Sequence, residues 1–127
     1  MYLNQIIAKN VNLSDARLSD ITFYKGDFQR ADLSNVVGID LKFDGTDLKH
    51  ANMRGAGFTG GYFHSAQMQY VDLGSSNFLG VDLAGSVMIG AHLPYANLMG
   101  TSLPHPINSA LTEGCSGCDE TLEGPNR

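Results

Sequence analysis

The chain has 127 residues, a formal net charge of −5 and 43% hydrophobic residues, which is the size and composition of a single folded domain. It contains no run of about 18 apolar residues, so we expect no membrane-spanning helix. Met1 is not followed by a basic and then apolar leader, so we see no secretory signal and expect a cytoplasmic protein.

Charge is distributed unevenly along the chain. Seven acidic residues balance seven basic residues between Met1 and Arg54. Between Gly55 and Asn126 there is neither Lys nor Arg, whereas six acidic residues lie there. A chain without a basic patch in its second half is a poor nucleic-acid binder, so we expect no nucleic-acid partner.

A period of five residues runs through the chain from Leu3 to Leu103. Of the twenty-one positions in this phase, nineteen are Leu, Phe or Met, and the exceptions are Ala8 and Gly38. Such a fixed period indicates a repeat architecture. Five residues fit neither the helical period of 3.6 nor the strand period of 2. Each unit must therefore be a short extended piece followed by a corner, and successive coils must pair at the strand spacing of about 4.8 Å.

The residues around each central position fit such a coil. The second residue after the centre is Gly in seven units and Asn or Asp in five, as expected of corners with positive φ. The second residue before the centre is small or β-branched in most units, because it points inward at a corner.

The number of units per coil stays open at this point, because the Phe spacing fits two solutions. Four units per coil would stack Phe23, Phe43 and Phe63 on one another. Three units per coil would stack Phe28, Phe43 and Phe58 instead.

Several units read alike, and they carry a family resemblance. These units are Ala31-Asp32-Leu33-Ser34-Asn35, Val71-Asp72-Leu73-Gly74-Ser75, Val81-Asp82-Leu83-Ala84-Gly85 and Ala96-Asn97-Leu98-Met99-Gly100. They resemble the A(D/N)LXX consensus of the pentapeptide-repeat family, over residues 1 to about 105. The resemblance implies an all-β fold: a right-handed quadrilateral β-helix with four pentapeptides per coil and about five coils. In that fold we expect a structural core that includes Phe23, Phe43, Phe63, Phe58, Phe78, Leu93, Leu98 and Leu103.

One central side chain is missing, at Gly38. A cavity there would cost up to about a few kcal/mol. We therefore expect Phe58 of the next coil, or a bulge that carries Val37 or Ile39, to fill the space.

With four units per coil, one outward column consists of Ile39, Thr59, Leu79 and Met99. Single exposed apolar residues are common on protein surfaces. A column of them also fits an interaction stripe for a partner protein, or for a second copy of the chain in a homodimer.

The polar residues show no catalytic arrangement. One column before the centre contains Asn12, Asp32, Asn52, Asp72 and His92, and the family resemblance implies that such residues bond neighbouring backbone groups. His50, His64 and His105 lie in no Ser/His/Asp or Cys/His pattern. We therefore expect no enzyme, no catalytic residue and no cofactor.

The repeat ends at Pro104 and Pro106, because Pro cannot donate to a β-ladder. This divides the chain into a β-helix of residues 1–105 and a C-terminal cap and tail of residues 106–127. We expect a short helical turn over residues 106–112, with Leu111 over the last coil. Cys115 and Cys118 form a CxxC pair, which could be free thiols, a local disulfide, a redox pair or half of a zinc site.

We expect the chain to present a rigid β-helix surface for contacts with a protein whose identity the sequence does not give. One alternative is the DNA-mimicking gyrase interaction of the quinolone-resistance members of the family. That reading faces a low acidic density, because only Asp72 and Asp82 lie between Gly55 and Thr112, whereas DNA carries a charge per about 1.7 Å. A second alternative is a metal or redox role of the CxxC pair.

Overall fold

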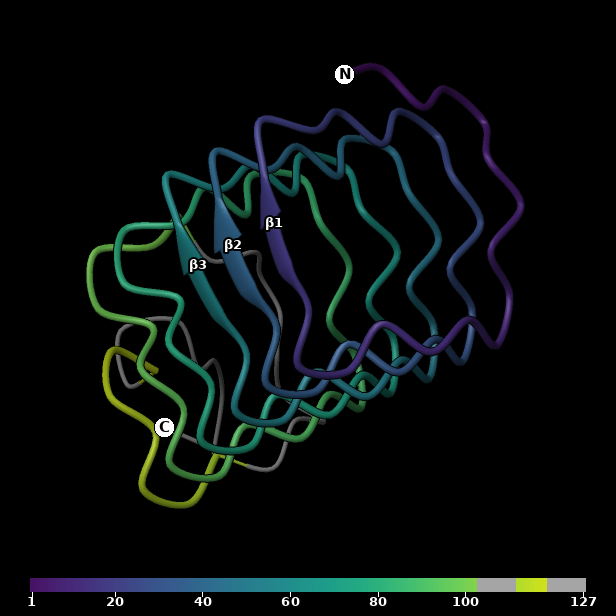
Figure 1. Ribbon diagram of the computed structural model, residues 1–127. Helices are drawn as coiled ribbons and strands as arrows, with labels where there is room; N and C mark the ends of the chain where they lie inside the picture. The colour runs from purple at the N-terminus through teal and green to yellow at the C-terminus, as the bar shows by residue number, and fades with distance from the viewer. Residues whose placement is uncertain (103–111, 119–127) are drawn as a thin grey trace.

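The computed structural model describes residues 1–102 and 112–118, and it shows a chain wound into a stack of coils (Figure 1). Three short strands lie on one side of the stack: β1 (Arg17–Ser19), β2 (Val37–Ile39) and β3 (Gly57–Thr59). They form a parallel sheet in the order β1-β2-β3. Leu18 pairs with Gly38, and Gly38 pairs with Phe58, so neighbouring strands are twenty residues apart.

The same spacing holds on the other sides of the rod. Parallel bridges join Tyr2 to Thr22, Asp27 to Asp47 and, near the far end, Asn77 to Asn97. Twenty residues per coil correspond to four pentapeptides, which resolves the choice between three and four units. The aromatic residues agree, because Phe23, Phe43 and Phe63 stack with ring centroids 4.9 Å apart.

The corners lie where the sequence predicts them. The second residue after each centre adopts a positive φ in all twenty units from Gln5 to Gly100. This includes Lys25 (54°) and Tyr95 (59°), residue types that do not favour this conformation. The packing of successive coils therefore imposes the corner even where the local residue does not prefer it.

The core is a column of side chains along the rod axis. The seven described members of the core expected from the sequence are each at most 4% exposed: Phe23, Phe43, Phe58, Phe63, Phe78, Leu93 and Leu98. The eighth, Leu103, lies outside the described residues. The inner space is filled by these side chains and by the small residues beside the corners, such as Ala31 and Ala66.

The space at Gly38 is filled from the neighbouring coil. Gly38 lies in β2 in regular register, so there is no bulge at this point. A Cβ at Gly38 would lie 2.7 Å from Phe58 Cδ1 and 2.7 Å from Leu41 Cδ1. The Phe58 ring therefore occupies the volume that a central side chain would need, as one of the two sequence hypotheses predicted.

Residues 112–118 return to the ladder after the end of the repeat. The amides of Tyr95 and Leu98 donate to the carbonyls of Glu113 and Ser116, both at 2.7 Å. The parallel bridge from Asn97 to Ser116 spans nineteen residues, one fewer than elsewhere. This segment therefore adds a rung over the last coil. The helical turn expected over residues 106–112 falls almost entirely outside the described residues.

Candidate contact surface

The side of the rod that carries β1 to β3 differs from the others in its outward residues. We call it the strand face and define it by the residues before and after each centre: Arg17, Ser19, Val37, Ile39, Gly57, Thr59, Asn77, Leu79, Asn97 and Met99. Arg17 is the single charged residue in this set. The strand face is thus a nearly uncharged surface on an otherwise charged rod.

Large apolar side chains are exposed on the strand face. Val37 is 46% exposed, Ile39 49%, Leu79 57% and Met99 51%. The predicted column of Ile39, Thr59, Leu79 and Met99 follows the twenty-residue register, in which Ile39 pairs with Thr59. A shallow hollow of about 150 Å³ lies at one end, between Arg17 and Ile39. The structure thus places these residues together on one face.

The other three faces carry ion pairs. Lys9 pairs with Asp27 at 3.6 Å, Arg54 with Asp72 at 3.3 Å and His64 with Asp82 at 2.7 Å. Exposed aromatic and aliphatic residues occur there too, for example Tyr62 and Ile89, but they share their faces with these charges. Within the described residues, no ion pair lies on the strand face.

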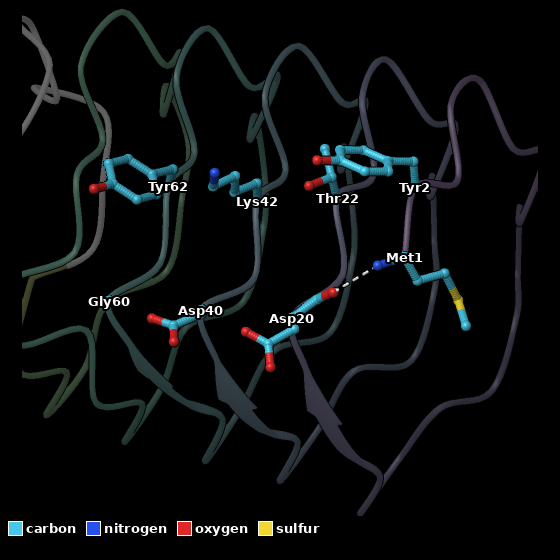
Figure 2. Close-up of a pocket in the computed structure, with 8 residues that line it drawn as sticks. All are labelled: Met1, Tyr2, Asp20, Thr22, Asp40, Lys42, Gly60 and Tyr62. Atoms are coloured by element: carbon cyan, nitrogen blue, oxygen red, sulfur yellow. Dashed lines mark hydrogen bonds between the residues drawn. The ribbon is translucent and has the colours of Figure 1, made fainter.

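A groove of about 480 Å³ follows the corner beside the strand face (Figure 2). Asp20 and Asp40, which directly follow β1 and β2, form one wall. Tyr2, Thr22, Lys42 and Tyr62 form the other wall, and the Met1 amino group donates to the backbone oxygen of Asp20 at 3.1 Å. Lys42 Nζ lies 5.8 Å from the centre of the Tyr62 ring. The groove is open and polar, unlike the enclosed, mostly apolar pockets that hold cofactors.

The pKa of His64 is shifted by a neighbouring carboxylate. The hydrogen bond to Asp82 raises the pKa of His64 above its ordinary value of 6.5, and the Asp82 and Asp44 charges act in the same direction. The same hydrogen bond, together with the amide of Ala84, lowers the pKa of Asp82 below 3.8. His64 thus belongs to a surface ion pair, and the Tyr62 ring lies edge-on to it at 5.4 Å. His50 stacks on Tyr70 at 5.1 Å, and His105 lies outside the described residues.

The polar residues before the centres bond the backbone, as the family resemblance implies. The side-chain oxygens of Asn12, Asp32, Asn52 and Asp72 each accept from the amide two residues later, at 3.0–3.1 Å. Asp27, Asp47, Asn77, Asp82 and Asn97 accept from the backbone in the same way. Their oxygens hold the turn together.

The CxxC pair forms a disulfide between Cys115 and Cys118. Cys118 is 1% exposed, and Cys115 packs against the core. Zinc binds the thiolate form of cysteine, so in this bridged state the pair offers no zinc ligands. Of the possibilities left open by the sequence, the structure shows the local disulfide.

Sequence reasoning missed Val37 and Gly57 as members of the strand face. Val37 and Ile39 flank Gly38 in an extended segment, and alternation in a strand puts both on the same side. That signal was present in the sequence. The place of Gly57 beside Val37 was not visible, because it depends on the register between neighbouring coils.

These features define a class of protein: a solenoid of five-residue units with four units per coil and a filled interior. A family model for pentapeptide repeats matches residues 8–37, 39–69 and 66–103, with eight copies. The chain therefore belongs to the pentapeptide-repeat family.

Solved structures confirm the fold. The pentapeptide repeat protein Rfr23 from the cyanobacterium Cyanothece 51142 superposes with a TM-score of 0.65 at 21% identity, covering 88% of each chain. A pentapeptide repeat protein of the Arabidopsis thaliana thylakoid lumen gives 0.63 at 19% identity, covering 81% of this chain and 68% of that one. The expected right-handed quadrilateral β-helix is thereby confirmed. At these identities the likeness extends to the fold alone.

A trypsin-treated variant of QnrB1, a plasmid-mediated fluoroquinolone resistance protein, gives a TM-score of 0.48 at 14% identity, covering 97% of this chain and 88% of that one. That score is too low to support an argument about function. No curated protein sequence matches the chain. Within the described residues there is no helix long and apolar enough to cross a membrane.

Proposed function

We propose that the chain is a non-enzymatic scaffold whose strand face binds another protein. The observation that carries this proposal is the gathering of Val37, Ile39, Leu79 and Met99 on one face with a single charge, while the other faces carry ion pairs. Contiguous exposed apolar surface bordered by polar residues is typical of protein interaction sites.

The fold supports this role because the surface is held in place before binding. Each coil is hydrogen-bonded to its neighbours, and the central side chains are buried from Phe23 to Leu98. A surface that is ordered in the free protein loses little conformational entropy when a partner docks. Rigid presentation thus supports affinity even where the contact area is small.

A photo-crosslinking experiment in the native host tests the proposal. A benzoylphenylalanine introduced at Leu79 should form an adduct with a partner protein. Ala84 provides a matched control, because it occupies the same position of its unit, is exposed, and lies on a neighbouring face. Adducts at Leu79 that are absent at Ala84 would support the proposal. No adduct at Leu79, or the same adducts at both positions, would overturn it.

In a homodimer, the strand face would bind a second copy of the chain. In sedimentation velocity, Leu79→Lys and Met99→Lys should lower the mass of a dimer, whereas Ala84→Lys should leave it unchanged. If the wild-type chain sediments as a monomer, or if the strand-face variants do not change its mass, the dimer form is wrong.

We also propose the cytoplasm as the location, and the disulfide is the observation that weighs against it. Disulfides persist in oxidising compartments and are rare in the cytosol. Alkylation of thiols in the native host before lysis tests the location. Two alkylated cysteines would support the cytoplasm, and a protected Cys115–Cys118 pair would contradict it.

A further inference from the structure

We infer that the Cys115–Cys118 disulfide is a redox switch, which closes the C-terminal edge of the rod when it is formed and opens that edge when it is reduced. In the bridged state the rung of residues 112–118 lies on the last coil. A dithiol reductant, either a small molecule or a protein, breaks the bridge and releases the rung. The switch gives the CxxC motif a role and does not depend on the strand face.

Backbone hydrogen bonds hold the rung on the last coil. The Tyr95 amide donates to the Glu113 carbonyl at 2.7 Å. The Leu98 amide donates to the Ser116 carbonyl at 2.7 Å, and the Ser116 amide donates in return to the Ala96 carbonyl at 2.8 Å. Of the ion pairs between described residues, none involves the rung. When the rung leaves, these groups of the last coil lose their partners and become an open β-edge.

Two glycines let the rung lie close to the last coil. Gly114 and Gly117 have φ values of 68° and 85°. A Cβ at Gly117 would lie 2.7 Å from the Leu98 carbonyl oxygen, and a Cβ at Gly114 would lie 2.5 Å from the Tyr95 ring. Glycine loses more conformational freedom on folding than any other residue. The rung therefore fits closely, but ordering it costs much entropy, and its docked state depends on the bridge.

The disulfide also closes the end of the core. The Leu98 amide donates to the Ser116 carbonyl, and elsewhere in the rod this bond marks the residue before a centre. Gly117 therefore stands where a central residue would lie, and it has no side chain. Cys118 is 1% exposed and belongs to the same apolar cluster as Leu98, with Cys115 packed against that cluster. The bridged sulfur atoms thus take the place of a central side chain, which links core packing to the redox state.

The two cysteines differ in access to a reductant. Cys118 is 1% exposed, whereas Cys115 is partly exposed. A thiolate of the reductant therefore attacks the Cys115 sulfur and forms a mixed disulfide with it, while Cys118 leaves as a thiolate and takes up a proton. The second thiolate of the reductant then displaces Cys115, which also takes up a proton. The reductant becomes a disulfide and the two cysteines gain its two electrons, and a disulfide of the same class reverses the reaction.

The bridge contributes enough to control the docking of so short a rung. In the chain-entropy account, closing a loop of this length favours the ordered rung about thirtyfold. Reduction should therefore favour the released rung by about that factor. The coils in the middle of the rod do not depend on the rung, because they are hydrogen-bonded to neighbours on both sides. Redox state thus changes the end of the rod and leaves the rest of the fold unchanged.

Equilibration of the full chain with mixtures of reduced and oxidised dithiothreitol, without denaturant, tests the switch. Alkylation followed by mass spectrometry measures the bridged fraction, and hydrogen exchange measures the protection of the Tyr95 and Leu98 amides. Protection of both amides should fall at least about tenfold in step with the bridged fraction and should return on reoxidation. Phe63, inside the rod, should keep its protection throughout.

A Cys115→Ala/Cys118→Ala variant is the matched control. In oxidising buffer its Leu98 amide should exchange as in the reduced wild-type chain, and dithiothreitol should change nothing. Protection at Phe63 checks that the variant folds, and if it does not fold the reduced wild-type chain still decides the question. Two results would overturn the switch. One is a bridge that is reduced only when urea unfolds the chain, and the other is a reduced chain whose Tyr95 and Leu98 amides keep full protection.

Discussion

At the residue scale, Gly38 shows how one coil compensates for another. The centre of this unit has no side chain, and the Phe58 ring of the next coil fills the space. Phe58 also contacts Phe78 with centroids 5.1 Å apart, so it belongs to the core column. Gly38 and Phe58 are thus a matched pair across two coils, although they are twenty residues apart.

Gly38→Ala should lower the free energy of unfolding by about 1–3 kcal/mol, because its Cβ would collide with Phe58 and Leu41. Urea denaturation measures this change. Gly57→Ala in β3 is the matched control, since that Cβ meets no atom within 4 Å, and it should be neutral or stabilising by about 0.5–1 kcal/mol. In a Phe58→Leu background, Gly38→Ala should cost less. Equal effects of the two glycine variants would contradict this account of the packing.

The stability that the His64–Asp82 pair contributes to the fold depends on pH. The pKa of His64 is raised by its hydrogen bond to Asp82. The folding stability that His64 contributes is therefore complete below its ordinary pKa of 6.5 and is lost as pH rises through the folded-state pKa. The pKa of Asp82 is lowered by the bond to His64. The folding stability that Asp82 contributes is therefore complete above pH 3.8 and is lost as pH falls through the folded-state pKa. The pair therefore stabilises the fold most between pH 3.8 and pH 6.5.

His64→Gln should destabilise the protein at pH 5 by about 0.2–1 kcal/mol, the range for exposed pairs, and by less at pH 9. The small size is expected because the His64 and Asp82 side chains are 41% and 35% exposed. Chemical denaturation of both proteins at the two pH values measures the difference. A difference that grows with pH would show that the sign is wrong.

At the element scale, the rung of residues 112–118 closes the end of the rod. It accepts hydrogen bonds from the amides of Tyr95 and Leu98, which would otherwise lie at an open edge. Open edges of β-structure invite pairing with other chains. The Cys115–Cys118 disulfide holds this rung in a turn whose sulfur atoms pack against the core.

Reduction of the disulfide, or Cys115→Ser, should loosen this rung. Closure of so short a loop contributes on the order of 2 kcal/mol in the chain-entropy account. Hydrogen exchange at the Tyr95 and Leu98 amides should accelerate, whereas exchange at Phe63, inside the rod, should not change. Unchanged protection at Leu98 would show that the rung holds without the bridge.

At the scale of the whole molecule, charge is distributed unevenly along and around the rod. Between Arg54 and Arg127 there is no Lys or Arg. The exposed apolar residues of the strand face lie between Val37 and Met99. Between Gly55 and Thr112 the two carboxylates are Asp72 and Asp82, and each forms an ion pair with Arg54 or His64. The surface in this region is thus far from the charge density of DNA.

Gyrase supercoiling should therefore be unaffected by micromolar concentrations of this protein, with or without a quinolone. The reason is electrostatic: DNA presents a charge per about 1.7 Å, whereas this part of the rod presents two carboxylates, of which Asp72 pairs with Arg54 and Asp82 bonds His64. A supercoiling assay on agarose gels measures the effect. Inhibition of gyrase, or its protection from a quinolone, would restore the DNA-mimicking alternative.

Much of the fold was predictable because the repeat is local. A Leu, Phe or Met at every fifth position, a small residue two places before it and a corner residue two places after it are all readable in the sequence. The corner at Tyr95 was harder to predict, because its positive φ opposes its own preference. The outward residues were the least predictable, since no packing requirement restricts them.

The coiling in five-residue units around an apolar core can be read from the sequence alone, because that requirement recurs within each unit. The features that depend on neighbouring coils emerge only in the folded chain. The twenty-residue register stacks Phe23 on Phe43, Phe58 fills the space at Gly38, and Val37, Gly57 and Leu79 become one surface. The physical reason is that hydrogen bonds between coils fix the register, and residues far apart in the sequence become neighbours only once that register is set.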